Sequence, residues 1–161
     1  MDRDDLYGAP LERFVTERTA LVRELRGAGR RDEANEVGGL RKPSIAAWAV
    51  NQLVRTQERA LSRLFTAGDA LRDAQAAVLA GRADAGSLRR AADHERAAVD
   101  TLLDAARGML SSEGHELSPV VIDRVAETLH AAATDEEARE LIASGRLERE
   151  LRHVGLGAAL S

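Results

Sequence analysis

Cysteine is absent from this 161-residue chain. Its absence excludes disulfide bonds, thiol catalysis, iron–sulfur clusters and zinc sites built on thiolates, so packing alone must hold the core together. Aromatic residues make up only 2% of the sequence, and Ile and Thr are sparse. Because these residue types favour strands, their scarcity predicts that the chain forms no β-sheet.

Long apolar runs are also missing. No stretch approaches the roughly 18 apolar residues that indicate a membrane-spanning helix. The N-terminal residues Met1-Asp2-Arg3-Asp4-Asp5 contain no apolar core of a signal peptide. We therefore expect a cytoplasmic protein that does not contact a membrane.

The abundant residues are Ala, Leu, Arg and Glu, which are strong helix formers. The length is that of one typical domain. The sequence thus predicts a single all-α domain over residues 1–161, in which three or four longer helices form a bundle with short peripheral helices. The tail from about 155 to 161 has little to pack and is expected to fray.

Proline, glycine and capping residues predict where the helices begin and end. The third predicted helix carries the longest apolar stripe, and Gly68 is a candidate for a break within it. In chain order, the predicted helices cover about residues 10–27, 31–37, 44–80, 84–110, 119–132 and 135–145. Either Pro43 or Ser44 opens the third of them, and either Ser87 or Asp84 caps the fourth. Their wide apolar stripes would also suit an antiparallel homodimer, because a face wider than one neighbour can cover needs another partner.

Charge is distributed unevenly along the chain. The formal net charge of -4 argues against general binding to nucleic acids or anionic membranes. Residues 23–63, however, contain nine basic and five acidic side chains, whereas residues 84–161 contain nine and fifteen. The two halves either attract each other or face solvent, or else the first half is a basic binding face.

The single tryptophan, Trp48, lies outside the main apolar face of the helix that starts at Ser44. It shares one strip of that helix with Gln52, Arg55 and Arg59, because the spacings are four, three and four residues. An indole beside two guanidinium groups is suited to stack on a nucleic-acid base or to contact a partner protein.

Other polar residues surround this strip. Arg41 and Lys42 precede the helix N-terminus, where an anion would be favoured, and Asn51 lies one step around the helix from the strip. The alternative is that the short helix near Val37 and Leu40 folds over the tryptophan, which would then belong to a second small core.

Two charged residues interrupt apolar stripes. Arg18 falls within the stripe of the first predicted helix, and Glu95 falls within that of the fourth. A buried charge without a partner costs several kcal/mol, so one hypothesis is that the two residues pair with each other. The alternative is that both side chains pack along the core and reach solvent with their charged ends.

Residue patterns for catalysis or metal binding are not evident. The four histidines, His94, His115, His130 and His153, have no metal-binding spacing. The glycine pairs do not form a phosphate loop, and no serine stands in a nucleophile elbow. We therefore expect no catalytic residue, metal or cofactor.

Several short segments of the chain form a recognisable set. The most specific is Leu40-Arg41-Lys42-Pro43-Ser44-Ile45-Ala46-Ala47-Trp48-Ala49-Val50-Asn51, which continues to Leu53. The others are Leu6-Tyr7-Gly8, Phe14, Gly68-Asp69-Ala70-Leu71-Arg72, Ala138-Arg139-Glu140-Leu141 and Gly145-Arg146-Leu147. In these segments the chain resembles a family of uncharacterised proteins from high-GC actinobacteria. The resemblance implies a helical cytoplasmic protein, and it carries over no catalytic residue because the family has no established activity.

The leading functional hypothesis is a non-enzymatic helical interaction module centred on the helix that starts at Ser44, with another protein or a second copy as its partner. The alternative is a nucleic-acid-binding module that uses the basic segment 23–63 and Trp48. A third hypothesis is an enzyme whose site is assembled from residues distant in sequence, which a pocket lined by converging titratable groups would indicate.

Overall fold

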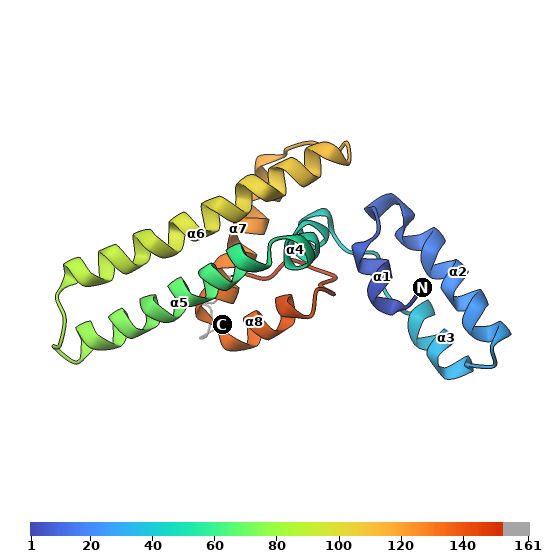
Figure 1. Ribbon diagram of the computed structural model, residues 1–161, viewed down its shortest axis with the longest axis horizontal. Helices are drawn as coiled ribbons and strands as arrows, with labels where there is room; N and C mark the ends of the chain where they lie inside the picture. Colours follow the sequence, from blue (N-terminus) through green and yellow to red (C-terminus); the bar gives the residue numbers. More distant parts are fainter. Residues whose placement is uncertain (153–161) are drawn as a thin grey trace.

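The computed structural model describes residues 1–152, and every regular element in that part of the chain is helical (Figure 1). The predicted all-α class is confirmed; the predicted fraying at 155–161 lies outside the described residues. The elements are α1 (Arg3–Gly8), the 3-10 turn η1 (Leu11–Arg13), α2 (Phe14–Gly27), α3 (Arg31–Gly38), α4 (Ile45–Thr56), α5 (Glu58–Leu79), α6 (Ala85–Ser112), α7 (Pro119–Thr134) and α8 (Glu136–Ala143). No helix in residues 1–152 is both long and apolar enough to cross a membrane.

Helix caps account for most of the observed boundaries. The Ser44 hydroxyl accepts a hydrogen bond from the amide of Ala47, and Asp84 and Asp135 cap α6 and α8 in the same manner. Gly145 follows α8 with a φ of 69°, a conformation that glycine adopts without strain. The starts of these three helices agree with the sequence prediction.

The first helix was not predicted. Asp2 and Asp5 form a capping box around α1, which buries Leu6 and Tyr7. With six residues, α1 is too short to show a clear apolar period. The predicted first helix at Pro10 begins instead with the 3-10 turn and continues as α2.

The predicted break near Gly68 is wrong. The long helical stretch is divided at Gln57, between α4 and α5, and Gly68 lies inside α5. A Cβ atom added at Gly68 would lie 1.8 Å from the carbonyl oxygen of Ala133 in α7. The glycine therefore allows the backbones of α5 and α7 to touch rather than ending a helix.

The end of α7 is held by one arginine from α8. Arg139 donates hydrogen bonds to the carbonyl oxygens of Ala132 and Ala133, at 3.2 and 2.8 Å. It also pairs with Asp69 of α5 at 2.9 Å and lies over the ring of Phe65. Since the last carbonyls of a helix lack partners within it, Arg139 satisfies them and links α5, α7 and α8. The hydrogen bond that Arg139 donates to the Asp69 carboxylate is also the main reason that the pKa of Asp69 lies below its usual value.

In the part of the chain that the structure describes, two hydrophobic clusters make up the interior. The main core is formed mostly by α4, α5, α6 and α7, with Ile142 of α8. The helices α1, α2 and α3 enclose a second cluster, in which the Tyr7 and Phe14 rings meet edge to face with centroids 5.5 Å apart. Figure 1 shows these three helices beside the rest of the molecule, with α1 facing α4. The α1–α4 contact therefore connects the two clusters.

Candidate interaction surface

The side chain of Trp48 belongs to the main core. It is 4% exposed, and its Nε1 atom donates a hydrogen bond to the carbonyl oxygen of Ala9, 2.9 Å away. The His115 ring lies against the indole, with centroids 5.6 Å apart. Val37 belongs to the second cluster, which α1, α2 and α3 enclose, and Leu40 packs against that cluster. The residues that cover the indole therefore differ from the predicted ones. A ring enclosed in this way is not available to stack on a base.

The neighbouring amide side chains are also buried. Asn51 donates a hydrogen bond from Nδ2 to the carbonyl oxygen of Leu147 at 3.0 Å, and its Oδ1 accepts one from the Leu147 amide at 2.9 Å. Gln52 donates from Nε2 to the carbonyl oxygen of Tyr7 at 2.6 Å. The two amides thereby fasten the C-terminal segment and α1 to α4.

Arg55 makes the largest number of these contacts. Its guanidinium group donates to the carboxylate of Asp4 at 2.8 Å, to the carbonyl oxygen of the same residue at 3.0 Å, and to that of Gly145 at 2.7 Å. An aspartate therefore balances its charge within the molecule. Arg59, one turn further along the chain in α5, is exposed.

Trp48, Asn51, Gln52 and Arg55 together form what we call the α4 clasp. The prediction that these four residues form a contact surface is wrong, because their polar groups bind other segments of the same chain. Of the predicted binding residues, only Arg41, Lys42 and Arg59 are exposed.

Carboxylates already lie beside the N-terminus of α4. Ser44 donates from its hydroxyl to Glu150 at 2.6 Å, and the amide of Arg41 lies 3.4 Å from the carboxylate of Glu148. The hydrogen bond from Ser44 lowers the pKa of Glu150 below its usual value. The place predicted for an external anion is thus taken by acidic side chains of the chain itself.

The predicted pair of Arg18 and Glu95 is also wrong. Arg18 belongs to α2 and donates to the carbonyl oxygen of Leu40 at 2.6 Å. Glu95 belongs to α6 and binds Nδ1 of His130 in α7 at 2.7 Å. Arg18 and Glu95 therefore lie in different parts of the fold, and each binds a different partner.

Glu95 and His130 border a groove at the end of α7. Glu95 is only 5% exposed, and the groove encloses a cavity of about 340 Å³. The cavity is lined by Leu71, Ala92, Glu95, Arg96, Glu127, His130 and Thr134. A carboxylate that orients an imidazole can serve acid–base chemistry, but it can equally tie two helices together. Among residues 1–152, no three potential ligands come together that could hold a metal ion.

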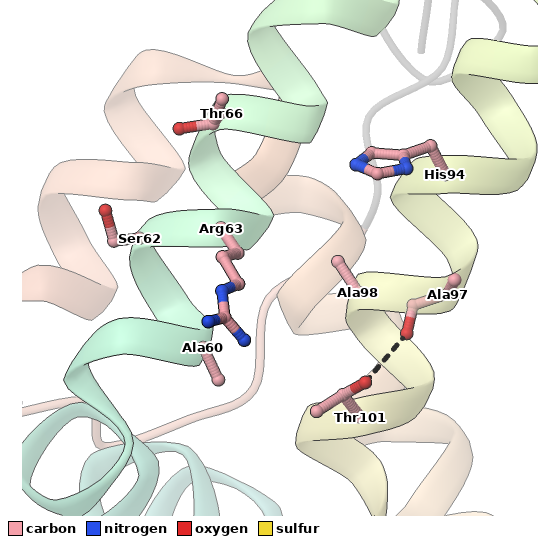
Figure 2. A pocket seen from close by; sticks show the side chains of 8 residues that line it. All are labelled: Ala60, Ser62, Arg63, Thr66, His94, Ala97, Ala98 and Thr101. Atoms are coloured by element: carbon pink, nitrogen blue, oxygen red, sulfur yellow. Dashed lines mark hydrogen bonds between the residues drawn. The ribbon is translucent and has the colours of Figure 1, made fainter.

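A second groove lies between α5 and α6 and encloses a cavity of about 320 Å³. Figure 2 shows Arg63 of α5 and His94 of α6 on its opposite walls. The remaining lining residues are small: Ala60, Ser62, Thr66, Ala97, Ala98 and Thr101. The groove thus offers one guanidinium group, one imidazole ring and small side chains, three of which carry hydroxyl groups.

The outer part of the α5–α6 hairpin projects beyond α7 and α8 (Figure 1). We call residues 69–94 the outer hairpin. None of them is buried, although Leu71, Val78, Leu88 and Ala92 continue the helical spacing of the core stripes. Leu79 is 89% exposed. The apolar stripes therefore continue past the point where α7 stops covering them.

Helical spacing identifies the side of the outer hairpin that α7 leaves uncovered. Leu71, Gln75 and Leu79 follow at intervals of four residues and continue the side of α5 on which Gly68 meets α7. Ala92 of α6 lines the same cavity as Leu71. The side that α7 leaves uncovered, which we call the outer face, comprises Leu71, Gln75, Val78, Leu79, Ala85, Leu88 and Ala92. Gln75, Leu79 and Ala85 are exposed, and the other four are half-buried.

Comparisons of the chain with known protein families, curated proteins and solved structures found no match.

Proposed function

We propose that the chain is a helical interaction module whose contact surface is the outer face. The observation that carries this proposal is the run of 26 residues, 69–94, in which apolar side chains keep core spacing and none is buried. Helices draw most of their stability from packing an apolar face, so two helices alone leave this stretch poorly supported. Exposed apolar patches on soluble proteins commonly mark interaction sites.

The shape of the outer face favours a helical partner. Ala85 and Ala92 are small enough for a second backbone to approach closely, while Leu71 and Leu79 offer larger side chains for interdigitation. A partner helix with an apolar stripe would lie along the outer face, in continuation of the line of α7. This proposal keeps the interaction module expected from the sequence but moves its surface from α4 to the hairpin.

Site-specific photo-crosslinking in cells that express the protein tests the proposal. Leu79 is replaced by benzoylphenylalanine, and Ala70 is replaced in a control that probes the opposite side of the same helix. The two positions are nine residues apart, which corresponds to about two and a half turns. We expect a discrete adduct from position 79 that is absent from position 70.

The adduct should also disappear when Leu71→Glu is added, because this charge would be buried in the contact. Equal labelling from both positions, or no adduct from position 79, would contradict the proposed surface. A circular-dichroism melt of each variant verifies that the helices remain folded.

A further inference from the structure

We infer that the partner at the outer face is a second copy of this chain, docked antiparallel so that the two hairpins form a four-helix bundle. This inference rests on the proposed function and specifies its partner. Each copy would place its hairpin tip against the base of the other outer hairpin, where Glu95 and His130 lie.

The charge of the outer hairpin fits a copy of itself. Residues 69–94 contain four arginines and four aspartates, giving a net charge of zero, whereas the whole chain has a net charge of -4. A two-fold interface brings the same patch from both copies together, so a patch of one sign would repel itself. The balanced outer hairpin avoids that repulsion.

The position of the charges favours the antiparallel direction. Arg82 is exposed at the tip of the hairpin, while Glu95 and Glu127 line the cavity at its base. The outer part of α5, residues 69–79, is about 16 Å long at 1.5 Å per residue. If two copies overlap along that length, the tip of each hairpin lies beside the cavity at the base of the other outer hairpin. A parallel arrangement would instead bring two Arg82 residues together and leave both acidic cavities empty.

The cavity can accept an arginine side chain. Leu71 and Ala92 provide apolar walls for the aliphatic stem, and the Glu127 carboxylate is exposed at the rim. Arg96, the cationic residue of the lining, already faces Asp93 at 3.3 Å. The exposed Glu127 carboxylate is therefore suited to bind a guanidinium group from outside.

Sedimentation velocity of the purified full chain over a wide concentration range tests the inference. We expect a species of twice the 17.3 kDa monomer mass. Leu79→Glu should shift the equilibrium to monomer, because it places a charge in the apolar contact. Ala70→Glu, on the opposite side of α5, should leave the dimer unchanged. Since both positions are exposed, both variants should keep the wild-type thermal stability of the monomer fold.

A charge-reversal cycle tests the direction of docking. Arg82→Glu and Glu127→Arg should each raise the dimer dissociation constant about tenfold, and the double variant should recover most of the loss. Losses that simply add would overturn the antiparallel arrangement.

A wild-type chain that stays monomeric at the highest concentration would overturn the second copy as partner. The proposed function would survive that result if position 79 still crosslinked to a different protein, and it would fail if no adduct formed. A dimer that persists in Leu79→Glu would place the interface elsewhere and overturn the inference.

Discussion

Replacement of Gly68 by alanine should destabilise the protein strongly, although alanine normally stabilises a helix relative to glycine. The added Cβ would lie 1.8 Å from the carbonyl oxygen of Ala133 and 2.4 Å from its carbonyl carbon. Both atoms belong to the backbone of α7, so no side-chain rotation relieves the clash. Restoring van der Waals separation requires α5 and α7 to move apart by roughly 1.5 to 2 Å.

That movement would loosen the main core, because α7 contributes Val125 and Leu129, both fully buried. Overpacked core substitutions cost about 1 to 3 kcal/mol when only side chains must adjust. Since a backbone contact cannot adjust in this way, we expect Gly68→Ala to lower the free energy of unfolding by about 3 kcal/mol or more. Urea denaturation followed by circular dichroism measures this change, and Trp48 fluorescence provides a second probe.

Gly108 provides a matched control. It lies inside α6, and a Cβ atom added there would have no neighbour within 4 Å. Gly108→Ala should therefore raise the free energy of unfolding by about 0.5 to 1 kcal/mol, the usual gain of alanine over glycine in a helix. If Gly68→Ala were as stable as the wild type or as stable as Gly108→Ala, the close α5–α7 contact would be refuted.

Three further changes test the α4 clasp and its surroundings. Arg55→Ala should lower the free energy of unfolding, measured by urea denaturation, by about 2 to 3 kcal/mol, because the carbonyl oxygens of Asp4 and Gly145 lose a charged donor. Arg55→Lys should recover little of this loss, since an ammonium group lacks the planar fork of a guanidinium group. His130→Leu should lower the free energy of unfolding by about 3 kcal/mol, because it leaves the buried Glu95 without its partner, and adding Glu95→Leu should restore it. If the two losses simply added, the residues would not be coupled. Glu150→Gln should lower the free energy of unfolding near neutral pH. The difference from wild type should vanish as the pH falls below 4.5 and through the lowered pKa of Glu150, because the hydrogen bond to the charged carboxylate is then lost. A difference that does not depend on pH would contradict this.

Local signals were sufficient to predict much of the fold. Ser44, Asp84 and Asp135 act on their own backbone neighbours within three residues, so the sequence alone reveals where their helices start. The division at Gln57 has no such signal, since neither glycine nor proline occurs there. Gly68 was misread because an isolated glycine in a helical pattern has two physical explanations, a break or a close contact.

The candidate site was predicted less well, for a different reason. Helical spacing correctly grouped Trp48, Gln52 and Arg55 on one strip of α4. Their partners, however, are largely backbone carbonyl groups, such as those of Ala9 and Gly145. Every residue carries a carbonyl oxygen, so no residue type in the sequence marks it as the acceptor. The same holds for Arg18, whose partner is another carbonyl group.

The α4 clasp also constrains the order in which the chain can fold during synthesis. Asn51 depends on Leu147 for both of its side-chain hydrogen bonds, and Arg55 depends on Gly145. The helix they belong to therefore leaves the ribosome well before its partners do, and buried amide groups without partners are costly. The contacts of α4 with α1, such as that of Gln52 with Tyr7, can form early, whereas those with Gly145 and Leu147 must wait until these residues have been made. Such contacts between distant segments slow folding, and they make the synthesis of residues 145–147 a condition for holding α4 in its final place.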